Sequence, residues 1–107
     1  MFFELRQYRT LPGKRAEWVA SMEAVILPFQ VATGMVVVGS FVGQEEDDDL
    51  CVWIRRFASE EERVARYRAV YESDFWKQDV APKVGALLDH ARSIITRIEA
   101  MPTSVLQ

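Results

Sequence analysis

The chain has 107 residues, of which half are apolar and 27% are charged, and its formal net charge is −3. This balance excludes a disordered chain and suits one domain with one hydrophobic core, spanning residues 1–107. The acidic pI of about 5.1 argues against nucleic-acid binding, which usually requires a basic patch. The apolar stretches are far shorter than the roughly 20 residues of a membrane helix, and the N-terminus is unlike a secretory signal. With a single cysteine, no internal disulfide can form, and we expect a cytoplasmic protein.

The first part of the sequence predicts a strand and then a helix. Residues 2–9 alternate between an apolar side, with Phe3 and Leu5, and a second side with Glu4, Arg6 and Tyr8. After a break at residues 11–13, apolar side chains recur at the spacing of one helix face: Trp18, Met22, Val25, Ile26 and Phe29. We expect Pro28 to kink or fray the last turn, and Gly34 to end the helix in a left-handed cap.

Two apolar segments then predict a hairpin. Residues 35–42 read as a strand that is apolar on both faces, and Gly39 inside it indicates a bulge. Residues 50–57 form the next strand, rich in β-branched and aromatic side chains. The acidic run QEEDDD between them lacks the alternating spacing and the glycine of a calcium loop, so it predicts a solvated hairpin tip.

The second half repeats the order of a helix followed by a strand. Ser59 and Glu62 have the spacing of a capping box, and the helical pattern behind them continues to about residue 73. Pro82 favours the first turn of a short helix that presents Val84, Leu87 and Leu88. Residues 92–98 read as a fourth strand, and the last residues as a tail.

This order of elements predicts an α+β protein of the ferredoxin-like βαββαβ type, with an antiparallel four-stranded sheet and helices on one face. In an isolated domain the uncovered face of such a sheet should be polar. Residues 35–42 and 50–54 are instead apolar almost without alternation, and the chain has no spare element to cover them. We therefore expect a homodimer that pairs through the sheet face.

Several ordered segments resemble the NIPSNAP proteins of the dimeric α+β barrel superfamily: FELRQYRTLPGKRAEW, VVGSF, VWIRRF followed by SEEER, VYESDFW and APKV. The resemblance covers most of the chain. It implies two ferredoxin-like subunits whose sheets face each other in a barrel, but it implies no particular reaction. The superfamily includes cofactor-independent quinol monooxygenases and haem-handling enzymes, and eukaryotic NIPSNAP relatives are discussed as adaptors.

On the third strand, Trp53 and Arg55 share one side with Phe57. A buried arginine needs a partner, because an unpaired charge is costly to remove from water. The partner of Arg55 is either a carboxylate such as Glu4, in a structural ion pair, or an anionic ligand.

Aromatic residues gather on the second helix and its exit: Tyr67, Tyr71, Phe75 and Trp76. They suit either a hydrophobic core or the wall of a pocket for a flat ligand. His90, the only histidine, could act as a base, although a structural role at a helix-to-strand junction is the simpler explanation. Without a second histidine or a ligand-spaced cysteine pair, no metal site and no cofactor is predicted. Cys51, between Leu50 and Val52, reads as a small strand residue.

The sequence thus leaves three functional hypotheses. The first is a homodimer that binds a small hydrophobic or anionic molecule between its sheet and helices, with ligand candidates Trp53, Arg55, Tyr67, Tyr71, Trp76 and His90. The second is a cofactor-independent monooxygenase acting on a phenol or quinol. The third is a structural or adaptor dimer without a ligand.

Overall fold

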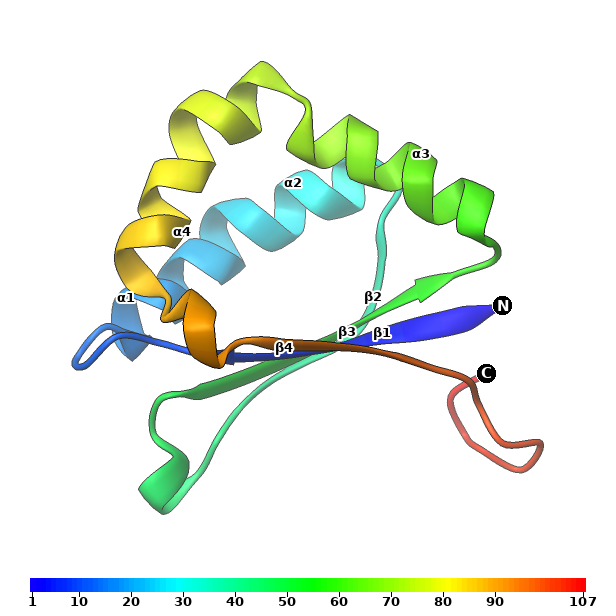
Figure 1. Cartoon of the computed structure of the whole chain (residues 1–107), viewed down its shortest axis with the longest axis horizontal. Coiled ribbons are helices and arrows are strands. Elements are labelled where there is room, and N and C mark those ends of the chain that lie inside the picture. Colours follow the sequence, from blue (N-terminus) through cyan, green and yellow to red (C-terminus); the bar gives the residue numbers. More distant parts are fainter.

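The computed structural model describes every residue from Met1 to Gln107. A four-stranded antiparallel sheet carries all the helices on one face (Figure 1). Its strands lie in the order β2-β3-β1-β4. They are β1 (Phe2–Arg9), β2 (Val36–Val42), β3 (Leu50–Phe57) and β4 (Ile94–Ile98). This order, with helical crossovers after β1 and β3, confirms the predicted ferredoxin-like α+β fold.

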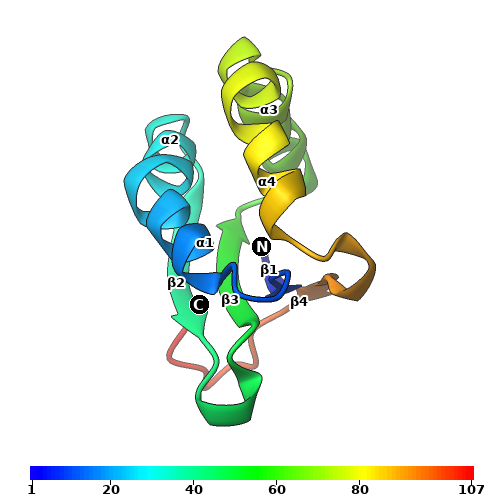
Figure 2. The same ribbon diagram turned by 90° about the vertical axis from the view of Figure 1, so that its left-hand side faces the viewer.

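Two helical crossovers lie side by side over the same sheet face (Figure 2). The first consists of α1 (Arg15–Ser21), a π-helical turn η1 (Met22–Ile26) and α2 (Leu27–Ala32). The second consists of α3 (Glu60–Tyr71), a π-helical turn η3 (Trp76–Val80) and α4 (Ala81–Leu87), followed by the short 3-10 turn η4 (His90–Arg92). No helix of the chain is long and apolar enough to cross a membrane.

The effect of Pro28 differs from the prediction of a disturbed last turn. Pro28 lies in the first turn of α2, and the irregularity is the π-helical turn η1 that precedes it. A proline has no N–H to donate, and its ring crowds the carbonyl four residues earlier, so a wider turn before it relieves the clash. The same arrangement recurs in the second crossover, where η3 leads into α4 with Pro82 in its first turn.

Other local predictions are confirmed with small shifts. The pairing of β2 with β3 shifts register between Val37 and Gly39, which is the expected bulge. Gly34 follows α2 with a φ of 100°, a conformation that favours glycine. The strand predicted from residue 92 begins at Ile94, because residues 90–92 form η4. The acidic hairpin contains a 3-10 turn, η2 (Glu45–Asp47), and Asp49 pairs with Arg9 and Arg92, at 2.9 Å each.

The capping box is present at the start of α3. The Ser59 Oγ accepts a hydrogen bond from the Glu62 N–H at 3.1 Å, and the Glu62 carboxylate accepts one from the Ala58 N–H. We predict that Ser59→Ala lowers the free energy of unfolding by about 1 kcal/mol, because one amide at the helix start loses its partner. Thermal or urea unfolding of Ser59→Ala beside the parent measures this loss. An unchanged unfolding midpoint would show that water replaces the serine at no cost.

The two faces of the sheet have different surroundings. On β3, the side chains that face the helices are all buried: Cys51, Trp53, Arg55 and Phe57. The opposite face has no helical cover (Figures 1 and 2). The strand register places apolar side chains from all four strands on it. Four of them are exposed by more than a third: Val36, Phe41, Ile94 and Ile98. The C-terminal tail reaches Phe3 and Ile54 on this face, and Phe3 is buried. The chain alone therefore leaves the rest of the apolar sheet face open to solvent.

Candidate functional site

The candidate site begins on the two central strands. In the antiparallel pairing of β1 and β3, Glu4 lies opposite Arg55 and Arg6 lies opposite Trp53. Residues opposite each other in such a pair project from the same face. Here that face is the one beneath the helices, so Glu4, Arg6 and Arg55 are all buried. A cluster of charged side chains thus lies between the sheet and the helical layer.

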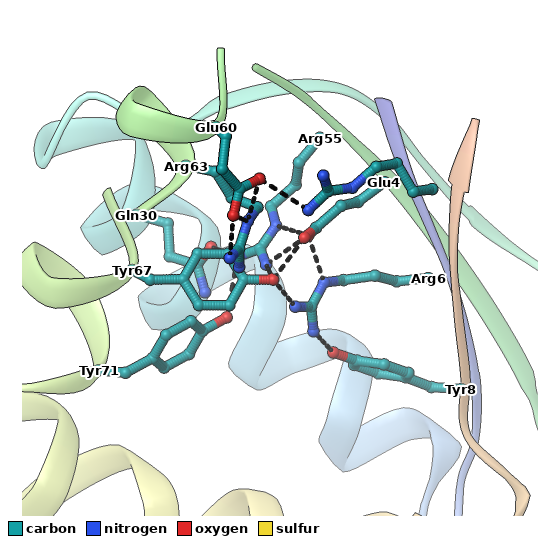
Figure 3. A network of polar contacts seen from close by, with 10 residues as sticks. Glu4, Arg6, Tyr8, Gln30, Arg55, Glu60, Arg63, Tyr67 and Tyr71 are labelled. Atoms are coloured by element: carbon teal, nitrogen blue, oxygen red, sulfur yellow. Dashed lines mark hydrogen bonds and ion pairs between the residues drawn. The ribbon is translucent and has the colours of Figure 1, made fainter. Parts of the chain in front are cut away.

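Glu4 is the centre of this cluster (Figure 3). Its Oε1 accepts hydrogen bonds from Arg55, with Nη2 at 2.8 Å and Nε at 3.2 Å, and from the Arg6 Nε at 3.2 Å. Its Oε2 accepts the hydroxyl of Tyr67 from α3. Burial would raise the pKa of Glu4, but the Tyr67 hydrogen bond and the two guanidinium groups outweigh burial and lower that pKa below its ordinary value of 4.5. Glu4 is therefore ionised at neutral pH.

Arg55 is completely enclosed by partners from three elements. Its Nη1 donates to the Gln30 Oε1 at 3.0 Å and to the Tyr71 hydroxyl at 2.8 Å, and its Nη2 also donates to the Tyr67 hydroxyl at 2.9 Å. With the two bonds to Glu4, these contacts engage all five N–H groups of the guanidinium. The residue has no exposed surface. Arg55 therefore ties β3 to β1, α2 and α3.

Arg6 uses fewer of its N–H groups within the chain than Arg55 does. Its three hydrogen bonds go to Glu4, to the Tyr8 hydroxyl through Nη1, and to the Tyr67 hydroxyl through Nη2 at 2.6 Å. Three of its five N–H groups are therefore engaged, and two have no partner within the chain. Arg6 also lines a cavity, which Arg55 does not.

This cavity has a volume of about 420 Å³ and lies between the sheet and the helical layer. Its lining is mainly aromatic and aliphatic, with Arg6 as its one permanent cation and no carboxylate. The side chains around it are Arg6, Tyr8, Trp18, Ile26, Trp53, Tyr67, Tyr71, Trp76, Val84, Leu88, His90, Ser93 and Ile95. Because the walls are mainly apolar and the hydroxyls of Tyr8 and Tyr67 gather around Arg6, the cavity suits a small molecule with one polar group.

Two further openings lack this combination. A groove of about 210 Å³ runs between α1 and the edge strand β2, and its lining is almost wholly apolar. A wider polar opening lies beside the acidic hairpin, lined by Arg15, Asp49 and Arg92, and Asp49 and Arg92 already pair with each other there. The groove has no cation in its lining, and the polar opening has no apolar wall, so we place the candidate site in the cavity beneath the helices.

The polar groups around the cavity are mostly hydrogen-bond donors. The hydroxyls of Tyr8 and Tyr71 each accept a bond from an arginine, and neither donates its own hydrogen to a group of the chain. The indole N–H of Trp53 is buried and has no partner. Burial raises the pKa of Tyr8, and burial together with the hydrogen bond to Glu4 raises the pKa of Tyr67. Both phenols are therefore neutral at physiological pH.

The structure brings five of the six predicted ligand residues together in the cavity lining: Trp53, Tyr67, Tyr71, Trp76 and His90. Arg55 lies in the adjoining polar network without lining the cavity, and Glu4 is its partner. His90 is an exposed residue of η4. Sequence reasoning missed Arg6 and Tyr8, although their alternation with Glu4 along β1 was the available signal. Cys51 is buried, and burial raises the pKa of its thiol, which suits a packing role.

Comparison with known proteins identifies the family. The family model named NIPSNAP matches residues 3–102. A NIPSNAP family protein from Agrobacterium tumefaciens is 22% identical over 99% of this chain and 98% of its own, with a TM-score of 0.88. A NIPSNAP domain protein from Burkholderia xenovorans is 17% identical over 97% of this chain and 98% of its own, with a TM-score of 0.84.

A more distant structural neighbour is a Chloroflexus aurantiacus protein named after the antibiotic biosynthesis monooxygenases. It is 17% identical over 98% of this chain and 99% of its own, with a TM-score of 0.55. No protein with a curated description matches the chain. At these identities the solved structures establish the fold alone, whereas the family model covers nearly the whole sequence. The chain belongs to the NIPSNAP family.

Proposed function

We propose that this protein is a homodimer that binds a small hydrophobic or anionic molecule in the cavity between its sheet and its helices. The observation that carries the proposal is the composition of the cavity lining. Aromatic walls from both crossovers enclose about 420 Å³ beside a buried arginine that keeps two free N–H groups. A hydrophobic core alone would fill this space, since protein interiors are close-packed.

Pairing through the open sheet face is the second part of the proposal. The apolar side chains on this face include Phe41, which is 58% exposed, and Ile94, which is 56% exposed. A second copy of the sheet supplies a matching apolar surface, and burial of such side chains contributes about 25 cal/mol for each Å² removed from water.

Sedimentation velocity tests this part of the proposal. At low micromolar concentration the parent should sediment with the mass of two chains, because a monomer would leave the apolar face in water. Phe41→Glu should shift the mass toward one chain, whereas Glu46→Lys on the acidic hairpin is a charge-changing control that should leave the dimer intact. A well-folded parent that sediments as one chain would contradict pairing through the sheet.

Intrinsic fluorescence tests ligand binding directly. All three tryptophans of the chain line the cavity: Trp18, Trp53 and Trp76. An aromatic molecule bound there should therefore shift or quench the emission in a saturable way. Titration with a panel of aromatic acids, phenols and quinols measures this effect, with the same panel added to urea-unfolded protein as the control. A folded protein whose emission no compound changes would favour the adaptor hypothesis.

The monooxygenase alternative is separated by a different measurement. The fold shared with the Chloroflexus aurantiacus protein motivates this test. If a quinol that binds the cavity also causes protein-dependent uptake of O2, the binding site is an enzyme site. If the quinol binds without O2 uptake, the cavity binds the compound without oxidising it.

A further inference from the structure

We infer that the molecule held in the cavity is an aromatic monoanion, a carboxylate or a phenolate, and that Arg6 rather than Arg55 holds its charged oxygen. The inference rests on the proposed binding function and names the class of ligand. It follows from the charge balance of the buried network, from the hydrogen-bond donors left free in it, and from the different positions of the two arginines.

The buried network has one positive charge too many. Two guanidinium groups, Arg6 and Arg55, share the single carboxylate of Glu4. No aspartate or glutamate lines the cavity, and the phenols of Tyr8 and Tyr67 stay neutral, so the chain supplies no second negative charge at this point. A buried charge without a partner is unfavourable. An anion in the cavity would complete the pairing.

The neighbouring ion pairs do not restore the balance. Beyond Tyr67, the carboxylate of Glu60 is shared by Arg63, at 2.6 Å, and Arg97, at 2.8 Å (Figure 3). This outer group therefore also contains two cations and one anion. Arg63 in addition lies over the Tyr67 ring, 4.6 Å from its centroid.

The free hydrogen-bonding groups lead to the same conclusion. Arg6 keeps two N–H groups without a partner, the hydroxyl hydrogens of Tyr8 and Tyr71 have no acceptor, and the Trp53 indole N–H is buried and unpaired. All are donors, and all belong to residues of the cavity lining. A buried donor needs an acceptor. A carboxylate or phenolate oxygen can accept several such bonds at once, whereas an ammonium or an alkane can accept none.

The positions of the two arginines distinguish their roles. Arg55 uses all five N–H groups on partners within the chain and does not reach the cavity. Arg6 carries the same charge, shares the same carboxylate and does reach it. Arg6 is thus the cation that can bind a ligand, and Arg55 is its matched structural control.

The rest of the molecule should be flat and apolar. Near Arg6, the rings of Tyr71 and Trp76 pack edge to face with centroids 4.9 Å apart, so two aromatic surfaces meet in the cavity wall. Such surfaces favour an aromatic ring in stacked or edge contact.

The test compares 2-naphthoate with 2-naphthamide, which has the same ring system but no charge. Binding of each is measured by tryptophan fluorescence and calorimetry, using the parent, Arg6→Met and Arg55→Met. We expect the parent to bind naphthoate more tightly than naphthamide. Arg6→Met should weaken naphthoate binding about 10- to 100-fold, the range expected when a hydrogen bond to a charged group is lost, and should leave naphthamide binding nearly unchanged. Arg55→Met should weaken naphthoate binding less than Arg6→Met does, because Arg55 contributes charge to the network but does not reach the cavity.

A second variant guards against misfolding of Arg6→Met, and a second probe distinguishes a carboxylate from a phenolate. Trp53→Phe removes one free donor and keeps an aromatic wall, so it should weaken naphthoate binding selectively even if Arg6→Met does not fold. With 2-naphthol as the probe, the absorbance of the naphtholate at neutral pH would report ionisation of a bound phenol, and its absence beside tight naphthoate binding would assign the site to carboxylates.

The outcomes separate the two proposals. If the parent binds neither naphthoate nor naphthamide, nor any other compound of the panel, the proposed binding function fails. If the parent binds naphthoate and naphthamide equally, the proposed binding function holds, but the inference that the ligand is an anion is wrong. If Arg6→Met folds and keeps the preference of the parent for naphthoate, Arg6 is not the anchor and the inference is overturned.

Discussion

Arg55→Met is expected to lower the free energy of unfolding by about 3 kcal/mol or more. Methionine has a similar reach but cannot donate. The substitution removes two of the three N–H bonds to the Glu4 Oε1 and leaves the oxygen of the fully buried Gln30 without its arginine partner. Tyr71 loses its arginine as well. A buried network that loses a central donor keeps the desolvation penalty of every acceptor it had satisfied.

An arginine outside the buried network provides the control for this experiment. Arg15, at the start of α1, has the same chemistry, but its one hydrogen bond, from Nη1 to the backbone oxygen of Asp48 at 3.2 Å, is exposed. Urea unfolding of Arg55→Met and Arg15→Met should therefore show a large loss of unfolding free energy for the first variant and a small one for the second. Equal losses would mean that the buried network contributes no more to stability than a surface contact does.

Glu4→Gln should destabilise the protein at least as strongly, by about 3–5 kcal/mol, because it leaves two buried guanidinium groups without their shared carboxylate. Glutamine is isosteric, so the packing is preserved while the charge and one acceptor oxygen are lost. Glu60→Gln is a matched control. Glu60 also joins two arginines, but its side chain is about half exposed, so solvent screens the change and the loss should be much smaller. A comparable loss in both variants would contradict the special importance of the buried carboxylate.

Glu4 should also make the stability of the protein depend on pH in the acidic range. The folded-state pKa of Glu4 lies below the ordinary value of 4.5, so the folded protein holds this carboxylate ionised at a pH where the unfolded chain has taken up a proton. The resulting stabilisation is complete above 4.5 and is lost as the pH falls through the folded-state pKa. Urea midpoints measured between about pH 3 and 6 should fall more steeply for the parent than for Glu4→Gln. Parallel curves would assign the acid sensitivity to other groups.

Much of the architecture could be predicted because local patterns and the global fold agree. The capping box at Ser59 marks the start of α3 within one residue, and Gly39 marks the irregular pairing of β2. The π-helical turns could not be predicted in the same way. The periodicity around Pro28 is that of an ordinary helix, and only the full backbone shows that the wider turn lies before the proline.

The aromatic walls of the candidate site could be predicted from the sequence, but the place of Arg6 in it could not. The aromatic residues Tyr67, Tyr71 and Trp76 suited either a core or a pocket wall in the sequence, and all three line the cavity. On β1 the alternation was correct, but a side with two charged residues and a tyrosine gives no sign that it faces the helices. Only the pairing of β1 with β3 places Arg6 opposite Trp53 and thereby inside the site.

The two π-helical turns have a consequence for motion. The cavity rests on β1 and β3, the central strands of the sheet, while its roof includes Ile26 of η1 and Trp76 of η3. Central strands exchange their amide hydrogens mainly through global unfolding, whereas irregular helical turns open locally. We expect slow deuterium uptake in the floor and faster uptake in the roof. A ligand could then enter by a local opening of the helical layer, while the sheet that carries the proposed dimerisation surface keeps its shape.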